Sequence, residues 1–224
     1  MARSGSKSIK DKNIKLLDGL PLLAYRIKAA LASELSGDVW ISTDSNLYAE
    51  TAKKFGAIVP FIRPSALAGD NSSSIDVTLH AMNHAEQGGL SYDYIALLEP
   101  TSPFVNVTDM DRAIERLDSH KSATGIVAVK ASRPSTVFIQ ENSEFLESLA
   151  KNLEKTTNLG RQHFKEEITP SGGFYIKKWE SMLADKSFYT SLTLSYLLDD
   201  ISGLEIDEPI DWTWAEFIIN TKKK

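Results

Sequence analysis

Segments with the apolar spacing of α-helices alternate with short runs rich in β-branched residues along most of this chain. Each run is short enough to be one buried strand. Regular alternation of this kind predicts an α/β fold, with a mostly parallel sheet covered by helices on both faces. Ligands should then gather at the carboxyl ends of the strands. We expect strands at Val39 to Thr43, Ile58 to Ile62, Tyr94 to Leu98, Thr124 to Lys130 and Gly173 to Lys177.

Capping residues and glycines set the limits of the helices between these strands. We expect helices at Leu20 to Leu35, Asp44 to Phe55, Ser73 to Gln87, Thr108 to His120 and Ile210 to Ile219. The segment 131–170 breaks the alternation because it is polar and charged. We interpret it as an inserted arm, with a hairpin and a helix near Phe145 to Leu153.

The size and composition of the chain favour one domain over residues 1–224, since 42% of the residues are hydrophobic. No apolar run approaches the roughly 20 residues that span a bilayer, and no apolar segment near the start suits a signal peptide. Cysteine is absent, which excludes disulfides and thiolate catalysis. We therefore expect a cytoplasmic enzyme with no membrane partner, in which any metal ion would have oxygen ligands.

The net charge of −5 hides a basic segment at the start of the chain. Its first fifteen residues hold five basic side chains, opposed only by Asp11. An acidic body with one short basic segment suits a small polyanionic ligand better than a nucleic acid duplex, which requires a broad basic face. We expect no nucleic-acid partner.

The basic segment has the composition of a phosphate-binding loop. It reads Arg3-Ser4-Gly5-Ser6-Lys7 and continues to Lys12-Asn13. Small residues let backbone amides approach a phosphate closely, and Arg and Lys neutralise its charge. The spacing matches neither the P-loop nor the dinucleotide fingerprint. Taken alone, such a terminus is more often a disordered tail.

Two carboxylates lie two residues apart in the extended segment Glu205-Ile206-Asp207. Side chains at this spacing point to the same side of an extended chain. Mg²⁺ prefers oxygen ligands and is commonly held by one or two carboxylates together with substrate phosphate oxygens. The pair is therefore a candidate site for Mg²⁺, with Mn²⁺ as a substitute. The alternative is that both acids face water or help to start the helix after Pro209.

An ordered set of short motifs resembles the acylneuraminate cytidylyltransferases, the CMP-sialic acid synthetases. The motifs are Arg3 to Lys7, Lys12-Asn13-Ile14, Gly19 to Leu22, Ser42-Thr43-Asp44 and Pro100 to Pro103. The resemblance implies a Rossmann-like nucleotidyltransferase that joins CMP from CTP to a nonulosonic acid, a keto-deoxy sugar acid, and releases pyrophosphate. It also implies a need for magnesium and a homodimer assembled through the arm at 131–170.

The resemblance assigns residues to the nucleotide. Arg3, Ser4, Gly5, Lys7, Lys12 and Asn13 match the nucleotide loop, in which Arg3 and Lys7 also serve catalysis by stabilising charge on the phosphates. Arg63 and Ser74 match positions that line the nucleotide pocket. Arg63 could instead be a solvated loop residue, and Ser74 could belong only to a helix cap.

A second group of residues matches the sugar-binding side. It comprises Glu99, Thr101, Ser102, Arg161 and Gln162, although a turn role suits Ser102 equally and Arg161-Gln162 could be exposed on the arm. Glu99 stands where the family commonly has Gln. A carboxylate only accepts hydrogen bonds, so the acceptor sugar could differ from N-acetylneuraminic acid. Gly160 and Glu205 also depart from the family pattern, at positions of an Arg and an Asp.

In this family an apolar strand precedes the basic loop, whereas here Met1-Ala2 stand before Arg3. Loss of a central strand exposes apolar surface and unpaired backbone groups. We therefore expect a truncated or mis-started reading of a longer chain. Otherwise another segment takes the place of that strand, or the basic loop is poorly anchored.

Two alternative functions stay open at this point. One is CMP transfer to a 3-deoxy-octulosonate, the eight-carbon keto acid of lipopolysaccharide. The other is a nucleotide-binding homologue without catalysis, which the departures at Glu99, Gly160 and Glu205 would suit.

Overall fold

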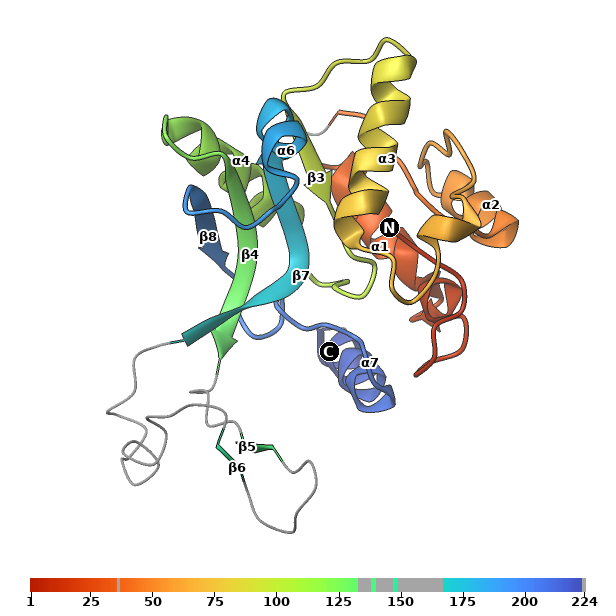
Figure 1. Ribbon diagram of the computed structural model, residues 1–224. Helices are drawn as coiled ribbons and strands as arrows, with labels where there is room; N and C mark the ends of the chain where they lie inside the picture. Colours follow the sequence, from red (N-terminus) through yellow and green to blue (C-terminus); the bar gives the residue numbers. More distant parts are fainter. Residues whose placement is uncertain (36, 133–137, 140–146, 149–166, 223–224) are drawn as a thin grey trace.

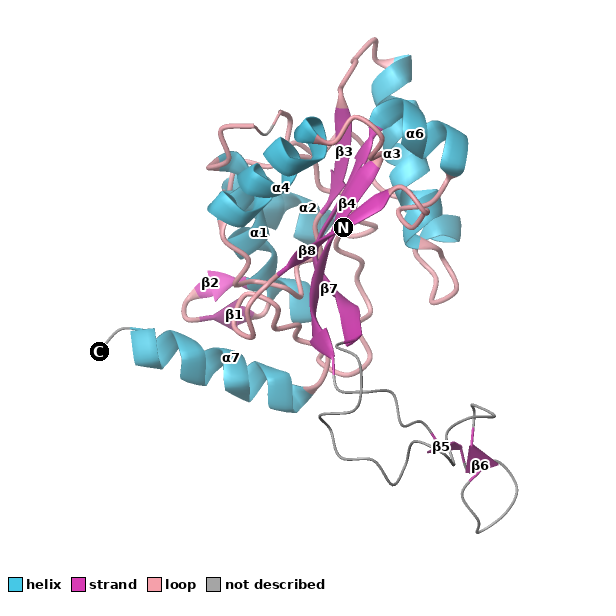
Figure 2. Ribbon diagram, turned by 90° about the vertical axis from the view of Figure 1, so that its left-hand side faces the viewer, coloured by secondary structure: helices cyan, strands magenta, loops and turns pink. Residues whose placement is uncertain are grey.

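A four-stranded sheet forms the centre of the protein in this computed structural model, which describes residues 1–35, 37–132, 138–139, 147–148 and 167–222. The strands lie in the order β3, β7, β4, β8. Their bounds are Tyr94–Leu97 for β3, Glu167–Lys178 for β7, Gly125–Ser132 for β4 and Thr193–Leu197 for β8. Helices cover both faces, as Figure 2 shows, so the expected α/β architecture is confirmed.

Three of the four strands run in one direction, as expected of a mostly parallel sheet, and β7 alone is reversed. β4 and β8 pair in parallel, whereas β7 is antiparallel to both β3 and β4. Two of the three pairings are therefore antiparallel, which the sequence-based expectation missed. The reversal follows from the connection, because the chain leaves the sheet at the end of β4 and returns beside it, so no crossover is needed.

The two strands expected at Val39 to Thr43 and Ile58 to Ile62 are reduced to a single parallel bridge between Trp40 and Ile58. Two backbone hydrogen bonds join them, from the Ile41 N–H to the Ile58 carbonyl at 2.9 Å and from the Ile58 N–H to the Val39 carbonyl at 2.8 Å. The predicted strands are therefore longer than the pairing that the structure shows. On the side facing β3, the Ala2 N–H donates to the Ser42 carbonyl at 3.1 Å.

The helices fall into two layers. Figure 2 places α1 and α4 on one face of the sheet, and α3 and α6 on the other. The bounds are Leu22–Leu31 for α1, Asn46–Lys54 for α2, Ser74–Gln87 for α3, Val107–Ser119 for α4, Trp179–Asp185 for α6 and Pro209–Lys222 for α7. The short elements are β1 at Leu16–Leu17, β2 at Leu20–Pro21, and 3₁₀ turns at Lys12–Ile14 and Ser65–Leu67.

The capping residues differ from the expected ones at two helices. Ser73 caps α3 as expected, with its hydroxyl accepting hydrogen bonds from the backbone of the first turn. Ser45, not Asp44, caps α2, and Asn106, not Thr108, caps α4. Asp44 is unavailable because its carboxylate binds Ser4.

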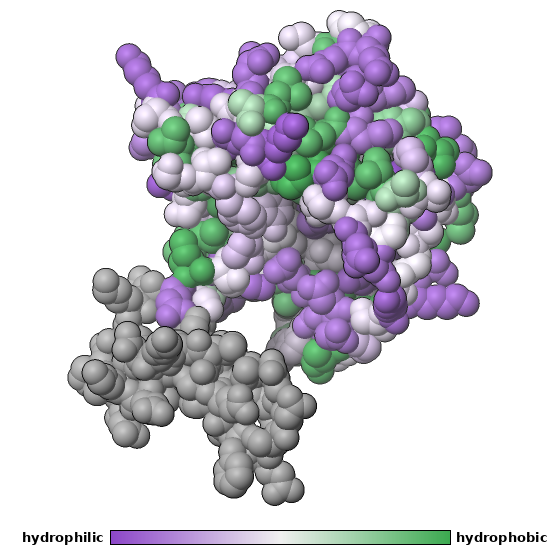
Figure 3. Space-filling model, in the orientation of Figure 1, coloured by the Kyte–Doolittle hydropathy of each residue, from purple (hydrophilic) through white to green (hydrophobic). Residues whose placement is uncertain are grey.

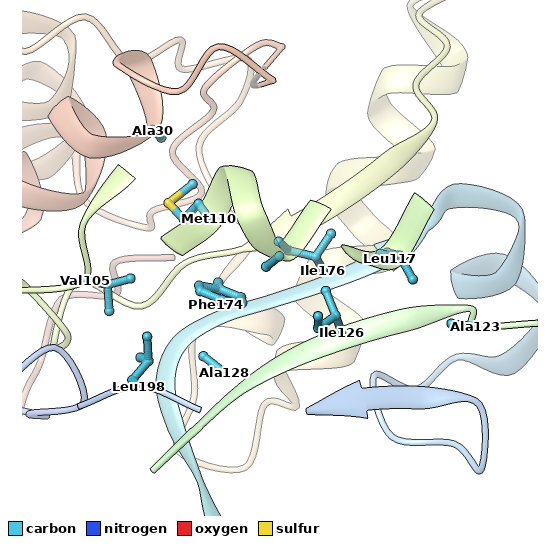
Figure 4. Close-up of a cluster of buried hydrophobic side chains, with 11 residues drawn as sticks. Ala30, Val105, Met110, Leu117, Ala123, Ile126, Ala128, Phe174, Ile176 and Leu198 are labelled. Atoms are coloured by element: carbon cyan, nitrogen blue, oxygen red, sulfur yellow. The ribbon is translucent and has the colours of Figure 1, made fainter. Parts of the chain in front are cut away.

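Two apolar clusters hold the layers to the sheet. Figure 4 shows the first, in which Met110 and Leu117 of α4 face Phe174 and Ile176 of β7. The second lies on the opposite face and joins Met82 of α3 and Met182 of α6 to the sheet. Burial on both faces keeps the strand ends fixed, and those ends carry the candidate site.

The arm expected at 131–170 leaves the sheet through two long strands, since β4 and β7 extend beyond their neighbours (Figure 1). β5 at Phe138–Ile139 pairs with β6 at Glu147–Ser148 in an antiparallel hairpin, as expected. The helix expected near Phe145 to Leu153 is wrong at Glu147–Ser148, which is strand. Arg161 and Gln162 lie outside the described residues.

No helix in the described ranges is long and apolar enough to cross a membrane. Hydrophobic residues on the face drawn in Figure 3 form separate patches among hydrophilic ones.

Candidate active site

A polar cavity of about 540 Å³ opens beside the N-terminal loop, beyond the carboxyl end of β3. It brings together most residues that the sequence assigned to nucleotide and sugar. The assigned residues that line it are Arg3, Lys7, Lys12, Asn13, Arg63, Ser74, Glu99, Thr101 and Asp207. Ser4, Gly5, Ser102 and Glu205 do not line it.

Ser4 and Gly5 shape the loop rather than face the cavity. The Ser4 backbone N–H donates to Asp44 Oδ1 at 2.8 Å and its hydroxyl to Oδ2 at 2.6 Å. Burial alone would raise the pKa of Asp44, but these hydrogen bonds outweigh it and the pKa lies below its usual value. Gly5 has a φ of 81°, which favours glycine at this turn. The loop is thus anchored at a charged carboxylate.

Lys12 and Asn13 are buried and hold the loop from within. The Lys12 ammonium donates to the Ile206 carbonyl at 2.8 Å and lies 3.1 Å from Asp207 Oδ1. The Asn13 amide donates to the Arg3 carbonyl at 3.1 Å. The hydrogen bond between residues 12 and 206 places the basic loop beside the acidic segment that is expected to bind metal.

Arg3 and Lys7 point into the cavity and share one carboxylate, Asp70. Arg3 Nη1 lies 2.7 Å from Asp70 Oδ1, and Lys7 Nζ lies 2.5 Å from Oδ2. Hydrogen bonds from Lys7 and Arg3 hold the pKa of Asp70 below its usual value. All three side chains are substantially exposed, so the pairs are weak. Asp70 therefore lies between two cations that line the cavity.

Arg63 and the N-terminus of α3 form the wall next to this cluster. Arg63 is buried and donates from Nε to the Ser42 hydroxyl at 3.0 Å and from Nη2 to the Ser42 carbonyl. Burial lowers its pKa, against the opposing charge of Asp44. Ser74 is the exposed first residue of α3, where backbone N–H groups favour anions. This wall is electropositive.

Glu99 and Thr101 also line the cavity, directly after β3. The chain turns there, with the Ser102 N–H donating to the Glu99 carbonyl at 3.2 Å. Ser102 is fully buried and its hydroxyl donates to the Ser171 carbonyl at 3.0 Å. The turn role is therefore the one that the structure supports for Ser102.

Glu205 and Asp207 lie on either side of buried Ile206, and each faces a lysine. Asp207 meets Lys12 inside the cavity, and Glu205 lies 3.3 Å from the Lys130 ammonium. Burial raises the pKa of Glu205, Lys130 opposes this, and the charges of Asp207 and Glu99 raise the pKa further. Glu205 is therefore within electrostatic reach of two carboxylates that line the cavity, Asp207 and Glu99.

Gly172 is required for this arrangement. Its φ is 61°, and a Cβ there would collide with the Glu205 carboxylate and crowd the Ser102 hydroxyl. Any side chain at this position would displace Glu205. The strand β7 therefore sets the position of the acid through a glycine.

Oxygen donors for a hard cation are present, but the described residues contain no group of three acids or histidines that could hold a metal by itself. Glu205 and Asp207 would leave several coordination positions to phosphate oxygens and water, which suits Mg²⁺. A cation would also relieve the repulsion that raises the pKa of Glu205. Asp207 lines the cavity and Glu205 does not, so a magnesium ion held by both together with a phosphate ligand stays a prediction.

Two residues that pair with charged groups of the site were not predicted from the sequence. Asp70 lies in a polar loop, and only its partners reveal its role. Lys130 ends a predicted strand, and nothing in its local sequence indicates an acidic partner 75 residues away.

Comparison with known proteins identifies a family. Residues 1–169 match the cytidylyltransferase family. The chain is 32% identical to CMP-N,N'-diacetyllegionaminic acid synthase of Legionella pneumophila, over 100% of this chain and 95% of that one. It is also 32% identical to N-acylneuraminate cytidylyltransferase of Escherichia coli, over 100% of this chain. It spans only 52% of that relative's length.

A solved structure shares the fold. CMP:2-keto-3-deoxy-manno-octonic acid synthetase, complexed with CTP, aligns with a TM-score of 0.70 over 99% of this chain and 96% of that one. Its sequence identity is 14%, so the likeness concerns the fold alone.

Replacing Asp70 with Asn should lower the KM for the anionic nucleotide by about two- to fivefold, with kcat little changed. The reason is that the ligand no longer has to displace a carboxylate from Arg3 and Lys7, and exposed ion pairs are worth about 0.2 to 1 kcal/mol each. Steady-state kinetics check this. Asp76 lies in the first turn of α3 and outside the cavity, so Asp76→Asn serves as the matched control. A raised KM in Asp70→Asn would show that Asp70 supports the loop and does not compete.

Proposed function

The chain belongs to the cytidylyltransferase family, and on that basis we propose that it transfers the CMP half of CTP to a nonulosonic acid and releases pyrophosphate. One observation carries the proposal most directly. A single cavity is lined both by the basic residues Arg3, Lys7 and Arg63 and by Glu99 and Thr101, which the sequence assigned to the acceptor. This arrangement suits a triphosphate facing a second, polar substrate.

The nonulosonic acid is the acceptor that the relatives' names favour. Two relatives at 32% identity are named for legionaminic and acylneuraminic acids. The octulosonate alternative has weaker support, since the protein named for that acid is 14% identical.

The residues of this chain act mainly by stabilising the charge that develops on the phosphates. In the reaction, the acceptor's anomeric hydroxyl releases its proton to solvent as its oxygen bonds to the α-phosphorus, and the bond from that phosphorus to the bridging oxygen of the β-phosphate breaks. The leaving pyrophosphate takes the electron pair. Arg3 and Lys7 stabilise this developing charge, and the N-terminus of α3 adds N–H dipoles. The backbone of their loop is anchored by hydrogen bonds of Asn13 and Ser4.

Glu205 and Asp207 would hold Mg²⁺ in this scheme, with Mn²⁺ as a substitute. The ion supplies charge neutralisation on the phosphates and orients them. Lys12 and Lys130 keep both carboxylates in place.

We further propose that the enzyme is cytoplasmic and a homodimer, joined through the arm at 131–170. The extension of β4 and β7 beyond the other strands of the sheet supports this proposal (Figure 1). A particle mass of two 24.8 kDa chains in light scattering would agree with this, and a monomer would not.

Pyrophosphate release from CTP tests the function. We expect release with Mg²⁺ and a nonulosonic acid from a panel of keto-deoxy sugar acids, and none in excess EDTA. UTP and ATP should be poor substrates. Release with octulosonate alone would favour the alternative acceptor. Binding of CTP without release for any sugar acid would favour a nucleotide-binding homologue without catalysis.

Glu99 should help to select the sugar. A carboxylate beside the acceptor sugar must pair with a donor on that sugar, or else desolvation of its charge costs free energy. Glu99→Gln should shift the ratio of kcat/KM toward N-acetylneuraminic acid, relative to the native acceptor, by about tenfold, since 1.4 kcal/mol is one decade. Glu99→Ala controls for lost bulk. Unchanged ratios in both variants would place Glu99 outside the sugar site.

A further inference from the structure

Asp211, in the first turn of α7, accepts two backbone hydrogen bonds from the residues before that helix. The Glu208 N–H donates to Asp211 Oδ2 at 2.8 Å, and the Asp207 N–H donates to the same atom at 2.9 Å. Hydrogen bonds to a carboxylate are charge-assisted and are stronger than those between neutral groups. Asp211 thus joins the start of α7 to the two acidic residues that line the polar cavity.

Only one of these two bonds is needed to start the helix. Pro209 opens α7 and has no N–H that needs a partner. An acid at the third position of a helix commonly accepts from the N–H of the residue that precedes the helix. The bond from Glu208 has this form. The bond from Asp207 comes from one residue farther out, so helix capping does not account for it.

The bond from Asp207 helps to fix the direction of the Asp207 side chain. Its N–H is held by Asp211, and its carbonyl accepts from the Ser8 hydroxyl. With both backbone groups bound, the side chain leaves the backbone in one direction, with Oδ1 3.1 Å from the Lys12 ammonium. The side chain is 66% exposed, so packing restrains it little. The backbone therefore sets where this carboxylate lies.

We propose that Asp211 is a positioning residue for the divalent cation of the reaction. It holds the backbone of Asp207 and so places the carboxylate that would bind the ion. Asp211 does not line the cavity, so it acts through Asp207 and not as a ligand. This inference rests on the proposed function, in which Asp207 holds Mg²⁺.

Binding of Mn²⁺ to the full chain in the presence of CTP, without a sugar acid, tests this inference. Water proton relaxation distinguishes Mn²⁺ on the slowly tumbling protein from the free complex of Mn²⁺ with CTP. Asp211→Ala should weaken Mn²⁺ binding by about tenfold or more, as removal of a group that orients a metal ligand typically does. Asp211→Asn keeps an oxygen acceptor of the same reach, so its Mn²⁺ affinity should stay within about threefold of the wild type.

Asn106→Ala is the matched control for stability. Asn106 caps α4 by accepting from the Asp109 N–H at 2.9 Å, and it lies outside the cavity. Loss of the cap at either helix should lower Tm by about 2 to 4 °C. Mn²⁺ binding should weaken in Asp211→Ala and not in Asn106→Ala, because only Asp211 holds the backbone of a metal ligand.

Asp211→Glu gives the answer if the alanine variant does not fold. Glutamate is the usual capping acid at the third helix position, so Tm should stay near that of the wild type. Its longer side chain moves the accepting oxygen, so Mn²⁺ binding should still weaken by about threefold or more.

Wild-type Mn²⁺ affinity in Asp211→Ala, or in Asp211→Glu if the alanine variant does not fold, would overturn the inference, since Asp211 would then only cap α7. Equal losses in Asp211→Asn and Asp211→Ala would also overturn it, because the charge of the carboxylate and not its hydrogen bonds would then matter. A wild-type protein that binds Mn²⁺ but releases no pyrophosphate with any sugar acid would contradict the proposed function and not this inference.

Discussion

The bond from Lys12 to the Ile206 carbonyl is the contact on which the candidate site depends. It joins the two ends of the chain, 194 positions apart, and it is nearly shielded from water. A buried ammonium must have partners, and here the carbonyl and Asp207 supply them. The basic loop and the acidic segment are thereby held next to each other, where opposite charges can act on one bound phosphate chain.

The sheet supplies the other half of this constraint. Arg26 of α1 is buried and donates to the Val105 and Gly173 carbonyls, both at 2.8 Å. Burial lowers its pKa to about 10, which leaves it charged at neutral pH. It fixes β7 where Gly172 makes room for Glu205. The reversed strand, through one glycine and one arginine partner, thus determines where the acidic segment can lie.

Much of this arrangement could be predicted from sequence, because it resides in local patterns. The alternation of elements predicted the layers, and the ordered motifs assigned Arg3 and Lys12 to one nucleotide loop, whose residues line the cavity. The direction of β7 could not be predicted, because strand direction leaves no local signature and follows from the connection.

Other features depend on partners distant in the chain. Asp70 could not be assigned, since a lone acid in a loop becomes informative only beside Arg3 and Lys7. Ser102 was given two roles because a hydroxyl in a turn suits both. The most direct test of the account is the dissociation constant of CTP, measured by calorimetry for Lys12→Met and for the exposed control Lys10→Met. Loss of the hydrogen bond from Lys12 to the Ile206 carbonyl should weaken CTP binding by about tenfold or more in Lys12→Met, or about 1.4 kcal/mol. The dissociation constant of Lys10→Met should stay near that of the wild type. Equal dissociation constants for all three proteins would contradict the claim that this contact organises the site.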